Sequence, residues 1–428
     1  MDEKASVKRA VERCLAAIER LDGHVRAWET VFAEEALRQA EELDREERPR
    51  PLKGLVVGLK DVFDLAGRPP GNGAPVKPDK VPKEDAALVR QLRSAGAVIL
   101  GTTKLTEFCW YRPTVTRNPH HLDHTPGGSS SGSAAAVAAG MVPFAVGTQT
   151  NGSVIRPASF CGVYGFKPTF GIVDTLGMTH ISRSLDHPGL FTREPEWLLR
   201  VFDVVTGYGG TGTAVTAERI QPSVVSRRLK VGVLDTSPME GITPDALAAV
   251  KRYAEALAAQ GHVVREMLVP SWFLNVKETF ESIFHPEVYS LLGPVLAAAE
   301  EEGTPVGPEI RWVVEQGSKA SIQSYLDGLR RKDELTWKVT ELFGDCDLLV
   351  LPSTLGPAPK GLSSTGNPAM STMSSIVGLP CASIPFGTSS DGLPLGVQVW
   401  ARKYHDRDLL SVLPELPAQQ VRPQYFAE

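Results

Sequence analysis

Serine hydroxyls are concentrated in two glycine-rich turns near the middle of the chain. The first turn covers residues 127–131 and the second covers residues 150–153, within a stretch rich in Gly, Ser and Ala, residues 125–169. A serine becomes a nucleophile when a base takes its proton and hydrogen-bond donors receive the charge on the attacked oxygen. The second turn offers Ser153 together with consecutive backbone N–H groups that could converge on one oxygen. By itself, Thr-Asn-Gly-Ser is also a common surface turn.

Histidine is the usual base for such a serine. Residues 128–132 match the Gly-x-Ser-x-Gly elbow of α/β hydrolases, with Ser130 as the nucleophile, but that motif follows a buried strand. Here a loop with two prolines and three histidines precedes it, so we interpret the match as accidental. The three histidines, His120, His121 and His124, are compatible with a solvated loop, a metal cluster or the rim of a site.

Lysine is the other available base. Lys60 follows the apolar run Leu-Val-Val-Gly-Leu, so its amine could lie in a dry interior. Burial lowers the pKa of a lysine, and the neutral amine can act as a general base near neutral pH. A lysine at the end of a strand is otherwise an ordinary surface residue with its charge in water. The two serine turns are what make Lys60 a candidate.

The residues around the turns resemble a known family. GGSSSGSAAAVAAG at 127–140 and GTQTNGSVIRPASFCGVYGFKPT at 147–169 closely resemble the amidase signature family, whose enzymes use a Ser–Ser–Lys triad. Matching segments run from about residue 50 to 205 and from 345 to 410. They include GLVVGLKDVFDLAG, ILGTTKLTEF, SRSLDHPGLFTR, VGLPCASIPFG and DGLPLGVQV.

The resemblance implies a role for each residue that matches the motif. Ser153 corresponds to the nucleophile, Lys60 to the general base, and Ser129 to a bridging serine held by a cis peptide bond. The implied mechanism is a relay in which Ser129 passes the proton of Ser153 to neutral Lys60 while Ser153 attacks an amide carbonyl. The residues expected to bind the oxyanion or the substrate are Gly128, Ser130, Thr150, Asn151 and Gly152.

The chain departs from the commonest family pattern beside the triad. Gln149 stands where many members have Asp, and Asn151 where many have Gly. Ser131 replaces a usual Gly, and Arg156 lies one place later than the frequent arginine. These differences favour the hydrolases of small amides and urea derivatives over the amidotransferase subunits.

We therefore expect hydrolysis of a linear carbon–nitrogen bond, amide or urea/carbamate-like, through an acyl-enzyme on Ser153. The alternative is the glutaminase (A-type) subunit of a tRNA-dependent amidotransferase, which would release ammonia from glutamine for a partner. A third hypothesis is a non-catalytic binding protein that keeps the fold. The sequence shows neither a clear glutamine pocket nor a clear partner site.

Strand and helix patterns alternate along the chain, which favours an α/β fold. With the resemblance, this predicts a single large domain with a central mixed β-sheet, helices on both faces and a mostly helical insertion. Residues 1–50 form an N-terminal helical segment and 51–428 the amidase domain. Within that domain, 51–208 and 345–428 form the core sheet that carries the triad, and 210–345 is the insertion covering the site.

Local signals predict several elements. We expect a strand at 97–105, a helix around 106–110, and a helix through residue 139 capped by Ser131 or Ser133. A loose Gly/Thr linker follows at 206–215. A helix to about residue 260 should begin with Thr243 as its cap and Pro244 in its first position. The large aromatic residues of 272–340 line an acyl pocket or pack in the core, and the pattern supports both equally.

Composition limits the remaining choices. The chain has 428 residues and a net charge of -5, so it has no general attraction to nucleic acid or anionic membranes. Its charged N-terminus lacks a secretory signal, and its five cysteines form no CxxC pair, which favours a cytoplasmic protein with reduced thiols. No cysteine has zinc-ligand spacing with a histidine, so we expect no metal and no cofactor. The expected partner is a small-molecule amide, and a homodimer remains open.

Overall fold

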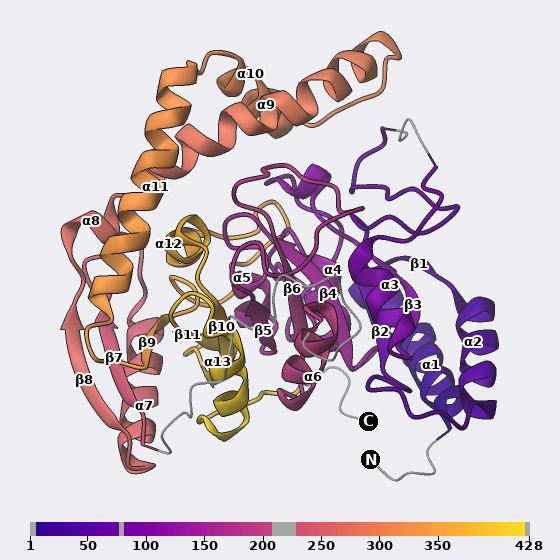
Figure 1. The fold of residues 1–428 in the computed structure, drawn as a ribbon, viewed down its shortest axis with the longest axis horizontal. Helices are drawn as coiled ribbons and strands as arrows, with labels where there is room; N and C mark the ends of the chain where they lie inside the picture. The colour runs from indigo at the N-terminus through magenta and orange to yellow at the C-terminus, as the bar shows by residue number, and fades with distance from the viewer. Residues whose placement is uncertain (1–5, 77–80, 208–227, 424–428) are drawn as a thin grey trace.

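A single large sheet organises the chain. The computed structural model describes residues 6–76, 81–207 and 228–423. Its 11-stranded sheet has the order β1-β3-β2-β4-β6-β5-β10-β11-β9-β7-β8. Parallel pairs join β2 to β3 and β4, and β7 to β8 and β9, whereas the other pairs are antiparallel. The predicted mixed sheet is confirmed (Figure 1).

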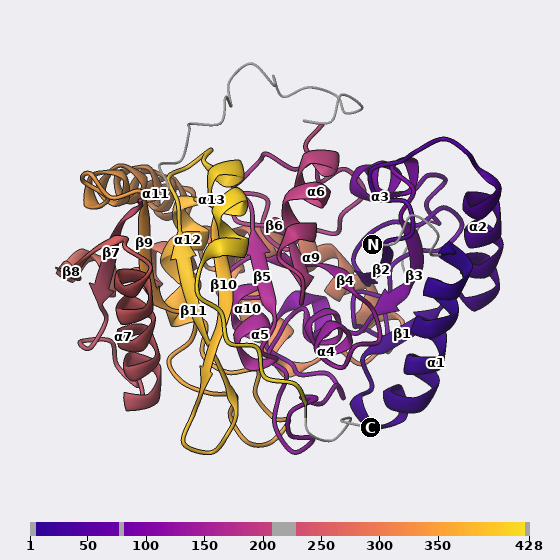
Figure 2. The same ribbon diagram turned by 90° about the horizontal axis from the view of Figure 1, so that it is seen from below.

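The strands are short and mostly buried. They are β1 (Trp28–Val31), β2 (Val56–Lys60), β3 (Val98–Thr103), β4 (Phe144–Gln149), β5 (Tyr164–Lys167), β6 (His187–Thr192), β7 (Lys230–Asp235), β8 (Val263–Leu268), β9 (Leu348–Pro352), β10 (Cys381–Thr388) and β11 (Pro394–Trp400). Every residue of β2, β3, β4, β5 and β6 is buried, because helices cover both faces of the sheet there (Figure 2).

The helices differ in length and exposure. They are α1 (Val7–Val25), α2 (Ala33–Arg45), α3 (Ala87–Ser94), α4 (Ser131–Ala138), α5 (Ile155–Phe160), α6 (Glu196–Val205), α7 (Pro244–Ala259), α8 (Ser271–Leu274), α9 (Lys277–Glu301), α10 (Pro308–Ser318), α11 (Ile322–Leu342), α12 (Ala369–Val377) and α13 (Asp406–Val412), with 3₁₀ turns η1 (Glu107–Cys109) and η3 (Leu413–Glu415). None of these described helices is long and apolar enough to cross a bilayer.

Helix α4 lies in the centre of the molecule. All its residues are buried, and most of them are Ala, Ser or Gly, so neighbouring backbones approach it closely. Its hydrophobic contacts belong to a cluster shared with α1, α2 and β3. The N-terminal helices and the element that follows the first serine turn therefore share one hydrophobic cluster, and both contact β2 or β3.

The two edges of the sheet compare differently with the sequence patterns. Residues 28–31 form β1, which pairs with β3 at one edge, so the N-terminal segment is not purely helical. This strand was missed because a short edge strand gives little periodic signal. At the opposite edge, the apolar runs KVGVLD and HVVREMLV on either side of α7 predict two strands of a β-α-β unit, and they form the parallel strands β7 and β8.

The predicted start of α7 is confirmed. Thr243 caps α7 by accepting a hydrogen bond from the N–H of Ala246, and Pro244 occupies the first turn. The helix expected around 106–110 is instead the 3₁₀ turn η1, which cannot continue because Phe108 and Cys109 have positive φ angles. Of the predicted 206–215 linker, residues 208–215 lie outside the described residues.

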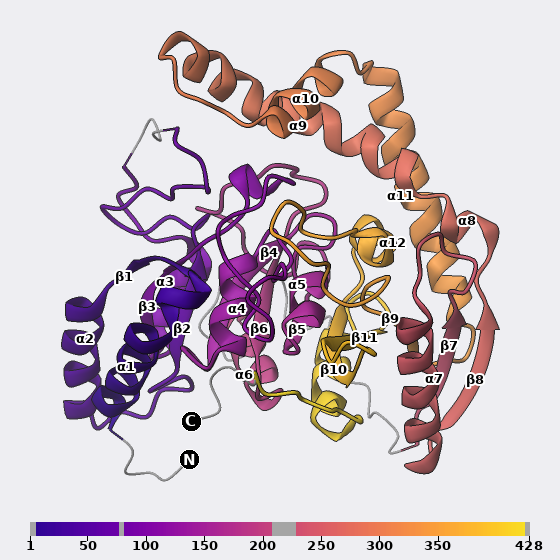
Figure 3. The same ribbon diagram turned by 180° about the vertical axis from the view of Figure 1, so that it is seen from behind.

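Helices α9, α10 and α11 form a separate arm beyond one end of the strands. Figures 1 and 3 show this arm projecting over the sheet, with α11 leading back toward β9. Helices α9 and α10 pack against each other, and α9 contacts both α11 and α12. We call α8 to α11 the helical cover.

Candidate active site

Lys60 ends strand β2 inside the protein. Its side chain is completely buried, and its Nζ lies 2.7 Å from the Ser129 Oγ and 2.6 Å from the Thr148 Oγ1. Burial lowers the pKa of the Lys60 amine below its ordinary value, since removing the ammonium from water disfavours its charge. The predicted dry environment of Lys60 and its contact with one serine turn are therefore present.

The first serine turn has an unusual backbone. The peptide bond between Gly128 and Ser129 is cis, as the resemblance implied. Gly127 has a φ of 85°, and a Cβ there would lie 2.9 Å from the Cα of Pro157, so only glycine fits without a shift. This close approach brings the first turn against the segment that follows Ser153.

Ser153 lies between β4 and α5 and is 7% exposed. Within the described ranges, its hydroxyl makes no hydrogen bond, and none of the N–H groups of residues 150–153 donates to a protein acceptor. The turn thus presents a free hydroxyl next to several free donors. Such donors can receive a developing oxyanion.

Arg156 connects the two turns. It lies on α5, three residues after Ser153, and its Nη2 donates to the Gly128 carbonyl oxygen at 2.7 Å. Its Nη1 donates to the Gly366 carbonyl oxygen at 2.8 Å. The guanidinium is buried, which lowers the pKa of Arg156 to about 10. Because one side chain binds the carbonyl of the cis peptide and the 366 loop, it fixes their relative positions.

Asp186 supports the second turn from the other side. Its Oδ1 accepts a hydrogen bond from the Thr150 Oγ1 at 2.6 Å, and its Oδ2 accepts from the N–H groups of Ile181 and Ser182. The Thr150 side chain is therefore directed at Asp186, which leaves its backbone N–H as the group available to a substrate.

Several of the predicted serines are buried and bond to the backbone, so their hydroxyls do not face the cavity. Ser130, expected near the oxyanion or substrate, is completely buried and exchanges hydrogen bonds with the backbone of Thr148. The expected cap of α4 is also different, because Ser131 donates to the Gly127 carbonyl oxygen and Ser133 to the Val146 carbonyl oxygen. These hydroxyls face inward because α4 is buried on every side.

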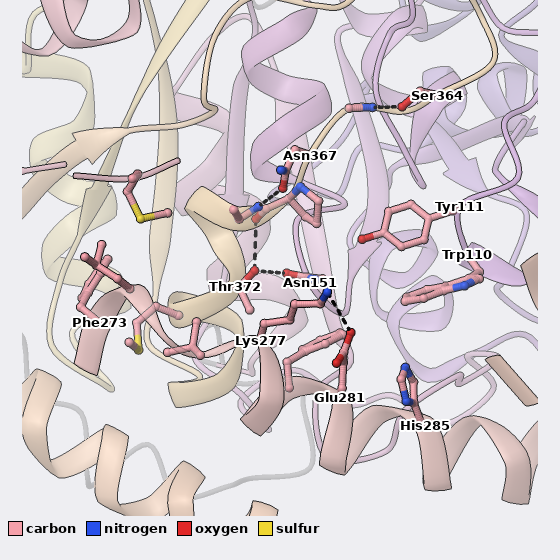
Figure 4. Close-up of a pocket in the computed structure, with 18 of the residues that line it drawn as sticks. Trp110, Tyr111, Asn151, Phe273, Lys277, Glu281, His285, Ser364, Asn367 and Thr372 are labelled. Carbon is pink, nitrogen blue, oxygen red and sulfur yellow. Dashed lines mark hydrogen bonds and ion pairs between the residues drawn. The ribbon is translucent and has the colours of Figure 1, made fainter. Parts of the chain in front are cut away.

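A cavity of about 590 Å³ begins at the second turn. Asn151 lines it, two residues before Ser153, and the other walls come from residues 110–111 after η1, from Met239, from α8, α9, α10 and α12, and from the 364–368 loop. Figure 4 shows Trp110 and Tyr111 on one side, with Glu281 and His285 rising from α9. Trp110 also stacks on Phe284 at a centroid distance of 4.3 Å. The lining thus combines aromatic side chains with polar and charged groups.

The aromatic residues of 272–340 divide between the two predicted roles. Phe273, Phe280 and Trp312 line the cavity. Phe284 is completely buried in the core, and Trp337 is exposed on α11. Helical spacing alone could not separate these groups, because pocket and core faces repeat with the same period.

The loop histidines bind backbone groups. The His120 Nε2 lies 3.0 Å from the Cys161 carbonyl oxygen, and the His124 Nδ1 lies 2.8 Å from the Ala358 carbonyl oxygen. Among the described residues, no group of three or more His, Cys, Asp or Glu side chains is arranged to hold a metal ion. All five cysteines are free.

Sequence reasoning missed Thr148 and Asp186 and gave Arg156 no role. Each acts through a contact with residues distant in the chain, such as Thr148 with Lys60. The available signal was their position in segments that resemble the family, Thr148 and Arg156 within 147–169 and Asp186 within SRSLDHPGLFTR.

The comparisons with known proteins agree on one group. A protein-family model described as Amidase matches residues 9–410. The A-type subunit of glutamyl-tRNA(Gln) amidotransferase from Koribacter versatilis (strain Ellin345) is 31% identical over 458 residues, which cover 96% of this chain and 94% of the relative. The AtzE subunit of 1-carboxybiuret hydrolase from Pseudomonas sp. (strain ADP) is 33% identical over 434 residues, covering 94% and 93%.

A solved structure has the same architecture. It comes from work described as "An unexpected vestigial protein complex reveals the evolutionary origins of an s-triazine catabolic enzyme". It superposes with a TM-score of 0.86 at 30% sequence identity, and the match covers 98% of this chain and 97% of that chain.

Proposed function

The chain belongs to the amidase signature family and is a hydrolase of carbon–nitrogen bonds, and from this premise we propose that Ser153 carries the acyl group of a small amide, urea or carbamate. Ser129 relays protons, and neutral Lys60 is the general base. The observation that carries this proposal is the completely buried Lys60 amine, 2.7 Å from the Ser129 hydroxyl.

The relay begins with a neutral amine. A neutral amine has one lone pair and two N–H donors, so Lys60 can accept the proton of Ser129 while it donates to the Thr148 Oγ1. Ser129 takes the proton of Ser153 as the Ser153 Oγ attacks the substrate carbonyl carbon. This step requires the two serine hydroxyls to come within hydrogen-bond distance when substrate is bound.

The oxygen of the attacked carbonyl gains negative charge at this stage. The free N–H groups of residues 150–153 are the donors that would stabilise it. When the tetrahedral intermediate collapses, the carbon–nitrogen bond breaks. The proton on Lys60 returns through Ser129 to the leaving nitrogen, which departs as an amine or ammonia. Water then attacks the acyl-enzyme through the same relay, releases the acid and restores Ser153.

The cavity supports an apolar or aromatic group on the substrate. Trp110, Phe273, Phe280 and Trp312 line it, and stacking or apolar burial against such side chains favours flat or hydrophobic groups. Lys277 and Glu281 lie at the same cavity and 3.8 Å apart, so their charges largely compensate each other. A substrate with one strong net charge is therefore disfavoured.

A panel of aliphatic amides, aryl amides, ureas and carbamates tests this proposal. Purified wild-type protein should release amine or ammonia from at least one class, and Ser153→Ala should release none. If Ser153→Ala retains the wild-type rate on the best substrate, Ser153 is not the acylated residue and the proposal is wrong.

A second candidate function is supported by the relative from Koribacter versatilis. That relative is the A-type subunit of a glutamyl-tRNA(Gln) amidotransferase, and the two chains match over almost their whole lengths. This candidate predicts glutamine hydrolysis that depends on added partner subunits, and weak action of the isolated chain on simple amides. Robust hydrolysis of simple amides by the isolated chain, without glutaminase activity, would contradict it.

A further inference from the structure

The Gln149 side chain connects the two ends of the second turn, residues 150–153, which we call the nucleophile turn. Gln149 is the last residue of β4 and is completely buried. Its Oε1 accepts hydrogen bonds from the N–H groups of Val154 at 2.8 Å and Ile155 at 3.0 Å. One amide oxygen thus joins the residue before the turn to the two residues after Ser153, which closes the turn into a ring.

The other end of the same amide reaches helix α12. The Gln149 Nε2 donates to the Ser375 Oγ at 2.9 Å, and the Ser375 Oγ donates to the Asn151 carbonyl oxygen at 2.5 Å. A hydroxyl has a single proton, and because Gln149 approaches Ser375 with an N–H donor and not an acceptor, that proton is left for the Asn151 carbonyl oxygen. The chain of donors therefore runs in one direction, from Gln149 through Ser375 to the turn.

Two further contacts limit the movement of this turn. Thr372, one helical turn before Ser375 on α12, donates to the Asn151 Oδ1 at 2.7 Å. The His187 Nδ1 lies 3.2 Å from the Gln149 carbonyl oxygen. Burial lowers the pKa of His187 well below its ordinary value, so the ring is neutral and donates through Nδ1. Helix α12 consequently holds Asn151 by both its side chain and its main chain.

The hydrogen bond from Ser375 to the Asn151 carbonyl oxygen also sets the direction of the Gly152 N–H group. A trans peptide unit is planar, so its carbonyl and its N–H point in opposite directions. The carbonyl of Asn151 is directed at Ser375, and the N–H of Gly152 is therefore directed away from α12. Gly152 is one of the residues whose N–H donates to no acceptor within the described chain.

We propose that Gln149 is a positioning residue which, through Ser375, aims the Gly152 N–H at the oxyanion, an inference that rests on the proposed function of Ser153. In this account α12 is part of the catalytic scaffold. Thr372 and Met373 of the same helix line the substrate cavity, so a bound substrate and the nucleophile turn contact one rigid element.

The substitution Gln149→Glu removes the hydrogen bond that residue 149 donates to Ser375 and keeps those that it accepts. The glutamate keeps oxygens for the Val154 and Ile155 N–H groups, but an ionised carboxylate cannot donate to Ser375. Ser375→Ala removes the next link without altering residue 149. Ser374→Ala is the matched control, because Ser374 is also completely buried on α12 but its hydroxyl donates to the Ser371 carbonyl oxygen.

Each variant is assayed at alkaline pH for kcat and KM and for its labelling rate with a fluorophosphonate. Gln149→Glu and Ser375→Ala should each lower kcat and the labelling rate roughly tenfold to a hundredfold, less than the 10²–10³-fold loss expected when an oxyanion donor is removed. KM should stay within about threefold, and the double variant should be no slower than the slower single variant. Ser374→Ala should retain wild-type kinetics.

Three results would overturn the inference. The first is wild-type kinetics in Ser375→Ala. This variant tests the same link, so the inference can be rejected even if Gln149→Glu does not fold. The second is an equal loss in Ser374→Ala, which would indicate a general effect on α12. The third is independent, multiplying losses in the double variant. Wild-type protein labelled at Ser153 separates these results from a failure of the proposed function, which would leave Ser153 unlabelled.

Discussion

The centre of the sheet and the helical cover differ in the kind of side chain that they bury and in how closely those side chains contact one another. Around the serine turns, polar side chains such as Lys60, Ser129 and Thr148 are buried and contact one another. In the cover, Phe280 and Phe284 are buried, but two other large aromatic side chains, Trp312 and Trp337, are 50% and 64% exposed. A buried polar group has a stable position only when its partners are in place, whereas an exposed aromatic ring can be replaced at little cost.

This difference suggests that the centre of the sheet carries out the reaction and that the cavity walls set the substrate preference. Short hydrogen bonds between buried side chains hold the reacting groups, and these bonds can form together in only one arrangement. The cavity walls are mostly supplied by α8, α9, α12 and loops, where apolar contact sets the shape. We therefore expect changes at the centre to act on kcat and changes in the cover to act on KM and substrate preference.

The largest effect is expected for Ser153→Ala, because the proposed acyl-enzyme cannot form. Activity on the best substrate should fall on the order of 10⁴-fold or more, measured by steady-state kinetics. Ser159→Ala is the matched control, since Ser159 is a buried serine on the adjacent α5 whose hydroxyl contacts Thr354. Comparable losses in both variants would remove the distinction between nucleophile and scaffold.

Lys60→Met should lower kcat about 10²- to 10⁴-fold, the usual contribution of a general base. Burial lowers the Lys60 pKa, and the neutral amine is the active form. Wild-type activity should therefore rise with pH as Lys60 loses its proton, and this rise should be absent from the variant. Cys109 and Asp186 are the other titratable groups that act on Lys60.

A second buried lysine provides the control for this pH profile. Lys167 is completely buried and donates to the carbonyl oxygens of Pro168 and Leu379, and burial lowers its pKa to about 8. Lys167→Met should keep the shape of the wild-type pH profile. If Lys167→Met abolishes the alkaline rise and Lys60→Met preserves it, the base has been misassigned.

Arg156→Met should have a smaller effect on both activity and stability. It leaves the Gly128 and Gly366 carbonyl oxygens without this donor, and the loss at the buried Gly128 carbonyl costs about 1–3 kcal/mol of unfolding free energy. We expect kcat to fall roughly tenfold to a hundredfold because the first turn loses its anchor. Urea denaturation measures the effect on stability, and steady-state kinetics measure the effect on activity. An unchanged kcat would show that the Arg156 hydrogen bonds are not required to position the first turn.

The smallest effect is expected in the cover. Trp312→Ala should change KM several-fold and alter the ranking of aryl and alkyl amides, since Trp312 lines the cavity and packs against His285. Its kcat on the smallest amide should stay within about threefold. Trp337→Ala, at an exposed tryptophan outside the cavity lining, should match wild type in both assays. Equal changes in the two variants would contradict a specific role for the cavity.

The sequence predicted the parts of the fold that depend on local chemistry. Thr243 and Pro244 define the start of α7 by their own backbone requirements, and the structure agrees. Strand β1 was missed because its pairing with β3 comes from a distant part of the chain. Phe108 and Cys109 adopt positive φ angles that their residue types do not indicate.

The same limit applies to the site. Lys60 and Ser129 were identified because a long motif resembles a family, and their contact is present. Thr148 and Asp186 carry no local signal, since a threonine in a strand and an aspartate before a strand are common. Ser130 was expected at the substrate from its place in the motif, but the direction of a side chain in a buried turn is set by packing.

The most direct test of the account is the site of covalent modification. The protein is treated with a fluorophosphonate, digested, and mapped by mass spectrometry, with Ser153→Ala and Lys60→Met treated in parallel. The account predicts one adduct on Ser153, none on Ser153→Ala, and slow formation on Lys60→Met. An adduct on Ser130, or labelling of Ser153 at the wild-type rate in Lys60→Met, would contradict it.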